Sequence, residues 1–351
     1  MKNQHRRWAF LSLAFVLVLA SACSKPRSSG PSFDLTVLAD SSDWNQVGSL
    51  VEELVASSWI SPQPEGLWNI VMADPVDLQA YLTRQNLLIL SCSSEEGSVH
   101  RFLQNLLPAE VQDRIHSEEA FAFLKQDAFA REQQFLILAA PTVASFERQL
   151  KSHQKDLQAS LLQYAYDRQT ERLFARLEQP QLADSLLALA GAAFRVPPDW
   201  FIEQYKPKEQ FMRFRRFYPD RWITVQWVDG DDSLRQSESG LREVRRRLGR
   251  SYWDKVYDEV GFGRFSLEAP ERLMGESCSK LEGLWGTDER LGGGPFLLWA
   301  VYDPDMGDAG RTFYIDAAVL SPGAAKSPWL HQLTCIARTF FKSAANATTK
   351  N

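Results

Sequence analysis

The sequence has few of the residues that usually build metal or catalytic centres. It has five histidines, of which His5 lies in the N-terminal leader, and the others are His100, His116, His153 and His331. No two of them stand at i, i+4 spacing, and no cysteine lies near them at the spacing of zinc ligands. The motifs of serine hydrolases, β-lactamases and zinc peptidases are also missing. The sequence therefore predicts no metal, no cofactor and no catalytic residue.

The chain also lacks an excess of basic residues and an apolar run long enough to span a membrane. The chain has 39 basic and 44 acidic residues, a net charge of −5. A general nucleic-acid binder needs a basic footprint, so nucleic acid is excluded as a partner. The apolar run Trp8–Ala20 has 13 residues, whereas a membrane-spanning helix needs about 20.

The N-terminus has the three parts of a lipoprotein signal. A basic start is followed by the short apolar run, and small residues then lead to Cys23. We predict that residues 1–22 are a signal peptide and that Cys23 is lipidated, the alternative being an ordinary signal peptide with an incidental cysteine. Two or three acyl chains, such as palmitate, would hold the protein stably at a membrane.

The residues around the cleavage point indicate a location. Ser24 stands where an aspartate would signal retention in the inner membrane, which favours the outer membrane, facing the periplasm. Residues 23–32 are small, polar and proline-containing, and are predicted to be a flexible tether. Removal of residues 1–22 takes away three basic and no acidic residues, so the remainder has 36 basic and 44 acidic residues and a net charge of −8.

The remaining chain divides into two parts of α+β class. Residues 33–195 alternate strand and helix, with buried-strand patterns at Leu87–Cys92 and Phe135–Ala139, and predict a layered α/β domain with a long helix over Thr142–Leu177. After Pro197-Pro198, residues 196–342 have the order βββ-α-βββ-α. This order predicts an antiparallel sheet with helices packed on one face. The tail 343–351 is predicted to be disordered.

Two loops look like ligand sites at first sight. Gly292-Gly293-Gly294-Pro295 is glycine-rich, but it precedes a strand and lacks the lysine of a phosphate-binding loop, so a tight connection is favoured. Residues 303–308 contain three aspartates, but Tyr314 stands where a calcium loop needs glutamate, which favours a hairpin turn.

The clearest candidate surface is a group of arginines in the second part. An anion or partner patch is predicted from five residues: Arg213, Arg215, Arg216, Arg242 and Arg246. Guanidinium groups pair with phosphates and carboxylates through two parallel hydrogen bonds. The alternative is a solvated helix face on which Glu238 pairs with Arg242.

Three cysteines remain besides Cys23. Cys92, Cys278 and Cys335 lie in apolar contexts and their spacings suggest no disulfide framework. An oxidising compartment would permit one disulfide, and a buried thiol is expected for at least one of the three.

The combined motifs resemble a known family. The lipobox, DLTVLADSSDW, NLLILSCS, LEGLWG and GGGPFLLWAVYD are similar to a domain-of-unknown-function lipoprotein family of Gram-negative envelopes, DUF4837. The resemblance implies envelope localisation and a two-part α+β build, and no activity. More distantly, Pro197–Trp200 before a row of strands is similar to PsbP-like and Mog1-like modules.

Two main functions remain open from the sequence. The preferred one is a non-catalytic, membrane-anchored lipoprotein that binds an envelope protein or glycan through its C-terminal sheet and loops. The alternative is an envelope hydrolase that acts on cell-wall or lipid material in an interdomain cleft. A third is a chaperone-like assembly factor. An enzyme should gather titratable side chains with shifted pKa values in one cleft.

Overall fold

A computed structural model describes residues 25–92, 97–252, 256–259, 263–287 and 292–342. The predicted signal peptide, Cys23 and the predicted tail 343–351 lie outside these residues. The chain forms two compact units. The N-terminal unit extends to Val55 and continues with Trp68–Gln158, and the C-terminal unit comprises Ala56–Leu67 and the chain from Ala159 onward. The predicted fold class is confirmed.

The N-terminal unit is a five-stranded sheet in the order β4-β1-β5-β7-β6. Its strands are β1 (Asp34–Ala39), β4 (Asn69–Met72), β5 (Asn86–Cys92), β6 (Ala122–Gln126) and β7 (Gln134–Ala140). Only β6 is antiparallel to its neighbour. Every residue of β5 and β7 is buried, as the apolar runs predict for parallel strands covered on both faces.

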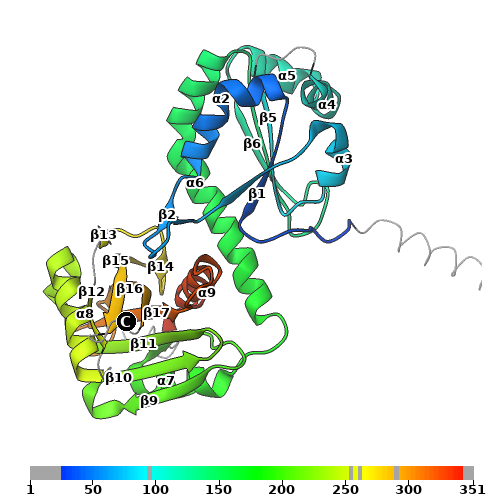
Figure 1. Cartoon of the computed structure of the whole chain (residues 1–351). Coiled ribbons are helices and arrows are strands. Elements are labelled where there is room, and N and C mark those ends of the chain that lie inside the picture. The colour runs from blue at the N-terminus through cyan, green and yellow to red at the C-terminus, as the bar shows by residue number, and fades with distance from the viewer. Residues whose placement is uncertain (1–24, 93–96, 253–255, 260–262, 288–291, 343–351) are drawn as a thin grey trace, which may run out of the picture. The chain divides into compact units, whose positions relative to one another are not determined.

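Helices cover both faces of this sheet. They are α2 (Ser41–Leu54), η1 (Pro75–Asp77), α3 (Leu78–Tyr81), α4 (Ser98–Leu106), α5 (Ala109–His116) and the first half of α6 (Val143–Phe174). Figure 1 shows α2 and α6 on one side and α3, α4 and α5 on the other. Val99 and Leu103 of α4 and Ile115 of α5 join the core formed by β5 and β7.

The predicted flexible tether is wrong for its described part. Ser28 N donates to Arg131 O at 2.9 Å, and Arg131 N donates to Pro26 O at 2.8 Å. Gln85 N donates to Ser29 O at 2.9 Å, and Ser28 is buried. Small polar residues suit a linker, but here their backbone groups pair with the loops that precede β5 and β7, so the segment is fixed to the unit.

The C-terminal unit is built on a nine-stranded antiparallel sheet. Its main path is β12-β15-β16-β17-β11-β10-β9, with β13 and β14 pairing with β15. The strands are β9 (Phe201–Lys206), β10 (Phe211–Arg216), β11 (Asp220–Asp229), β12 (Val256–Glu259), β13 (Arg264–Ser266), β14 (Arg272–Leu273), β15 (Glu276–Thr287), β16 (Gly293–Asp303) and β17 (Arg311–Leu320). A turn at Met274 and Gly275, both with positive φ, separates β14 from β15.

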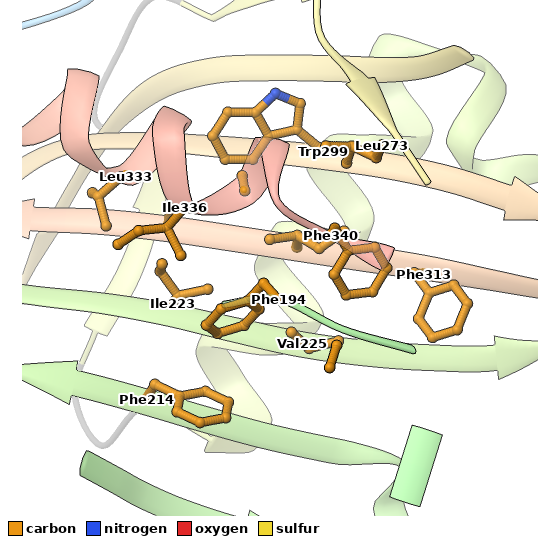
Figure 2. Packing of buried hydrophobic residues seen from close by; sticks show 14 of the residues in the cluster. Phe194, Phe214, Ile223, Val225, Leu273, Trp299, Phe313, Leu333, Ile336 and Phe340 are labelled. Carbon is orange, nitrogen blue, oxygen red and sulfur yellow. The ribbon is translucent and has the colours of Figure 1, made fainter. Parts of the chain in front are cut away.

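Helices lie on both faces of this sheet, whereas the sequence predicted one face. α7 (Pro180–Ala190) and α9 (Ser327–Arg338) pack on the face that carries Ile223, Val225 and Trp299. Figure 2 shows Leu333 and Ile336 pointing from α9 toward the sheet. α8 (Glu238–Tyr252) packs on the opposite face. Both faces of β16 and β17 are apolar, so helices must pack on both faces to bury them.

Several short elements complete the unit. They are η2 (Pro207–Glu209), η3 (Ser233–Gln236) and two strand pairs, β2 (Ser58–Trp59) with β3 (Glu65–Gly66) and β8 (Ala192–Ala193) with β18 (Phe341–Lys342). The predicted domain boundary at 195/196 differs from the observed one at Ala159. Phe174 at the end of α6 and Leu186 of α7 belong to the core of the C-terminal sheet, which draws this stretch into the second unit.

The glycine-rich segment forms the start of β16 instead of preceding it, and the neighbouring strands approach it closely. A Cβ on Gly294 would lie 2.0 Å from Val319 O, so only glycine fits between β15 and β17. We expect Gly294→Ala to lower the free energy of unfolding by about 1–3 kcal/mol, because backbone must shift. Gly292→Ala is the matched control, since its nearest atom would lie 3.7 Å away. Urea denaturation measures both, and equal losses would contradict this explanation.

Among the described helices, none is both long enough and apolar enough to cross a membrane.

Candidate binding site

A buried lysine lies between two carboxylates in the C-terminal unit. Lys280 Nζ is 2.9 Å from Glu271 Oε1 and 2.9 Å from Glu282 Oε1. The three side chains are 5–10 % exposed. Lys280 Nζ also lies 5.7 Å from the ring centroid of Trp59 and 5.4 Å from that of Trp299. We call Lys280, Glu271 and Glu282 the Lys280 cluster.

Strand register explains how these residues meet. Lys280 and Glu282 alternate with Leu281 along β15, so both point to the face that carries α9. Trp299 of β16 is the direct cross-strand partner of Lys280. On the other side of β15, Ser266 of β13 pairs with Lys280 and Arg264 with Glu282. Backbone pairing therefore places Lys280 and Glu282, and Glu271 comes from the loop before β14.

The cluster lines a pocket of about 560 Å³ that lies within the C-terminal unit. The walls come from β2, the second half of α6, β13, β15 and α9. The lining residues besides the cluster include Trp59, Leu67, Ala159, Leu162, Tyr166 and Arg264. A second hollow of about 610 Å³ shares Gln163, Pro270 and Arg338 with it.

Three residues that line the pocket, Trp59, Leu67 and Tyr166, contact the buried His331. His331 Nε2 lies 3.0 Å from Leu67 O, which can only accept, so this nitrogen carries the proton. His331 Nδ1 then accepts from the Tyr166 hydroxyl at 3.1 Å. Trp59 packs edge-on to His331 and donates to Ser327 Oγ at 3.1 Å. These bonds orient the side chains of Trp59, Tyr166 and His331.

Burial keeps His331 neutral. Burial lowers the pKa of His331 to about 3. The hydrogen bond to Leu67 acts to raise this pKa, and the nearby Lys280 charge acts to lower it. The unfolded chain binds a proton near pH 6.5 that the folded chain does not bind, so stability falls as pH drops below 6.5. This histidine should contribute a slope of about 1.4 kcal/mol per pH unit down to about pH 3.

We therefore expect the free-energy difference between wild type and His331→Gln to shrink between about pH 7 and about pH 5. Urea denaturation at both pH values measures it, with His153→Gln, an exposed site, as the control. A constant difference would show that the pKa of His331 is the same in the folded and the unfolded chain, and would contradict the lowered pKa.

The charges of Glu271 and Lys280 stabilise each other. Burial acts to raise the pKa of Glu271, but Lys280 outweighs it, so the pKa of that carboxyl is lowered. Burial acts to lower the pKa of Lys280, and the two glutamates reverse this, so the pKa of the amine is raised. A general acid needs a raised carboxyl pKa, so Glu271 is unsuited to that role.

The second oxygens of both glutamates are unsatisfied in the described part of the chain. Glu271 Oε2 and Glu282 Oε2 are buried and have no hydrogen-bond partner among the described residues. Glu282 Oε2 lies 3.8 Å from Arg264 Nη1, beyond hydrogen-bond distance. Buried polar atoms are normally satisfied, so two acceptors in one pocket indicate a ligand that donates hydrogen bonds.

The N-terminal unit has a smaller pocket of about 170 Å³ at the carboxyl ends of β5 and β7. Ser91 Oγ lies 3.2 Å from His100 Nδ1, and His100 Nε2 lies 2.9 Å from Gln104 Nε2. The Asp40 carboxylate accepts backbone hydrogen bonds from Val99 and His100 at the start of α4. His100 therefore contacts the side-chain amide of Gln104, whereas the histidine of a catalytic triad contacts a carboxylate.

The predicted arginine patch is divided by salt bridges. Arg213 and Arg215 of β10 both bind Glu203 at 2.6 Å, and Arg216 lies 3.5 Å from Asp199. Arg242 of α8 binds Glu238 at 2.5 Å, the i, i+4 pair that the alternative predicted.

The five arginines do not form one surface. Arg213 and Arg215 share one face of the sheet, and Arg216 points to the other. Arg246 is half-buried on α8. The patch stays a prediction, and its carboxylate partners reduce the charge that it could offer to an anion.

The other sequence candidates have structural roles. Asp303 is buried and pairs with Lys342 at 2.9 Å in a hairpin between β16 and β17. Cys92, Cys278 and Cys335 are buried, and none forms a disulfide. The described residues hold no group of three or more His, Cys, Asp or Glu side chains placed to bind a metal.

Two family models match the chain. Residues 28–174 match the Domain of unknown function DUF8532, and residues 180–339 match the Domain of unknown function DUF4837. The second match confirms the resemblance predicted from the sequence. No curated protein matches the chain.

Two solved structures are similar to part of the chain. The solution structure of cyanobacterial PsbP (CyanoP) from Synechocystis sp. PCC 6803 has 12 % identity and a TM-score of 0.30, and covers 44 % of this chain and 87 % of that one. The crystal structure of LpqN, involved in cell envelope biogenesis of Mycobacterium tuberculosis, has 12 % identity and a TM-score of 0.29, and covers 43 % and 82 %. Likenesses of this size say nothing about function.

Proposed function

We propose that this chain, which carries a DUF4837 domain, is a lipid-anchored protein of the cell envelope that binds a glycan without catalysing its cleavage. The observation that carries the binding role is the Lys280 cluster, with two buried acceptor oxygens in a pocket of about 560 Å³. The N-terminal signal and Cys23 support the location, at the outer membrane facing the periplasm.

The chemistry of the pocket selects a neutral donor. Its lining has two carboxylates, Glu271 and Glu282, and three basic side chains, Lys280, Arg264 and Arg338, so the charges nearly balance. Hydroxyl or amide groups can donate to Glu271 Oε2 and Glu282 Oε2 without added charge. Leu67, Leu162 and the aromatic side chains offer an apolar wall. A saccharide presents both a hydroxyl edge and an apolar ring face.

Binding rather than hydrolysis follows from the protonation states. A glycosidase needs one carboxyl group that is protonated and another that is ionised. The lowered pKa of Glu271 favours its ionised form, so this carboxyl group is unsuited to donate a proton. The proposed role is therefore recognition.

The location is tested at Cys23. We expect mass spectrometry of the mature protein to find an acylated Cys23 at its N-terminus. Cys23→Ala should move the protein from the membrane fraction to the soluble or precursor fraction. An unmodified thiol in a membrane-free mature protein would overturn the anchor and leave the pocket proposal standing, because saccharide binding is measured separately.

A further inference from the structure

The N-terminal segment of the described chain lies along one edge of the N-terminal sheet. β1, β4, β5 and β7 are parallel, so their amino ends share an edge. Ser29 bonds to the backbone of Thr83 and Gln85 before β5, and Ser28 to Arg131 before β7. Figure 1 shows this segment entering β1 at the end where its arrow begins.

Further side-chain bonds hold the segment in place. Ser28 Oγ donates to Glu132 O at 3.0 Å, and Lys25 Nζ donates to Asp127 O. Arg27 binds Glu132 at 3.0 Å. Asn86 Nδ2 donates to Ser32 O and to Asp34 O at 3.0 and 2.8 Å. The chain is therefore attached to the unit from Lys25 onward.

This attachment leaves only a very short length of chain between the unit and Cys23. Two residue steps separate Cys23 from Lys25, and each step spans at most about 3.6 Å, so the two lie within about 7 Å. The headgroup layer on each side of a bilayer is itself about 5–7 Å thick. An acylated Cys23 would therefore bring Lys25 to the level of the headgroups.

The edge also has the charge that suits anionic lipid. We define the anchor edge as residues 25–34, 83–86 and 125–134. It contains five basic residues and three acidic ones, a net charge of +2, in a mature chain of net −8. Lys25, Arg27, Lys125 and Arg131 are exposed. Basic residues close to an anionic bilayer each contribute about 1 kcal/mol to binding.

We propose that the anchor edge is the surface that faces the bilayer, in contact with its lipid headgroups. The inference rests on the lipid anchor of the proposed function. β5 is seven residues long, so its carboxyl end lies about 20 Å from the anchor edge. The pocket at Ser91 and His100 then opens on the side away from the membrane.

The test uses the mature chain, residues 23–351, with Cys23 coupled to a maleimide lipid in vesicles of phosphatidylglycerol and phosphatidylcholine. Coupling is selective because the other three thiols are buried. Lysine acetylation read by mass spectrometry then reports which amines the bilayer covers. We expect Lys25 and Lys125 to react at least severalfold more slowly than in uncoupled protein mixed with the same vesicles. Lys151, exposed on α6, should react at an unchanged rate.

A twelve-residue Gly-Ser insertion between Ser24 and Lys25 is the matched variant. It keeps the coupling but releases the edge, so the labelling of Lys25 and Lys125 should recover. Neutral phosphatidylcholine vesicles should give weaker protection than mixed ones. Full labelling of both lysines in the coupled wild type would overturn the proposal. Since the coupling replaces natural acylation and leaves the C-terminal pocket untouched, that result would not bear on the proposed glycan binding.

Discussion

Lys280→Met is expected to lower the free energy of unfolding by about 3–5 kcal/mol, the usual cost of breaking a buried ion pair by removing one partner. The substitution keeps the length of the side chain and its packing against Trp59 and Trp299. It leaves Glu271 and Glu282 buried and close together, without the amine that lies 2.9 Å from each of them. Urea denaturation followed by tryptophan fluorescence measures the loss.

Two comparisons isolate the electrostatic cause. Lys151→Met removes a lysine that binds Glu147 at 2.7 Å on an exposed helix face, and it should leave stability unchanged. Adding Glu271→Gln and Glu282→Gln to Lys280→Met removes the stranded charges and should restore much of the loss. If the triple variant is no more stable than Lys280→Met, the cost comes from packing and the electrostatic account fails.

Ala159→Trp is expected to reduce saccharide binding by at least about tenfold, which corresponds to about 1.4 kcal/mol. Ala159 lies on α6 at the pocket wall and is exposed. An indole there would occupy the space that a ligand needs, while the helix and the Lys280 cluster stay intact. Isothermal titration with chitotriose and with maltotriose measures the affinity of wild type and variant.

Ser185→Trp is the matched control for added bulk. Ser185 is an exposed position of α7 in the same unit and does not line the pocket. It should bind saccharide as the wild type does, and both variants should keep the wild-type melting temperature. Failure of the wild type to bind either sugar would contradict the proposed ligand class. Equal binding by wild type and Ala159→Trp would place the sugar outside this pocket.

The sequence predicted most of the strands of both sheets because apolar periodicity determines them. The apolar runs of β5 and β7 and the alternation of Ile223, Val225 and Trp227 in β11 reappear as buried strands. The position of the helices was harder to predict. β16 and β17 are apolar on both faces, and this pattern indicates that helices pack on both faces of the sheet.

The pocket could not be predicted because its residues come from distant parts of the chain. Trp59, Tyr166, Arg264, Lys280 and Arg338 meet only through tertiary structure. One local signal existed. Lys280 and Glu282 alternate with Leu281 in a strand that also has Cys278 on their face, so two charges stand where burial was expected. Opposite charges two residues apart on a buried strand indicate an internal ion pair.

Two of the three buried thiols, Cys278 and Cys335, lie in the C-terminal unit, where their burial limits disulfide exchange in an oxidising compartment. Burial raises the pKa of Cys278 and of Cys335 to about 12, so these two side chains hold almost no thiolate at neutral pH. Disulfide exchange needs the thiolate, and therefore waits for a local opening of the C-terminal unit. The rate at which an added disulfide reagent consumes these sulfurs thus measures how often that core opens.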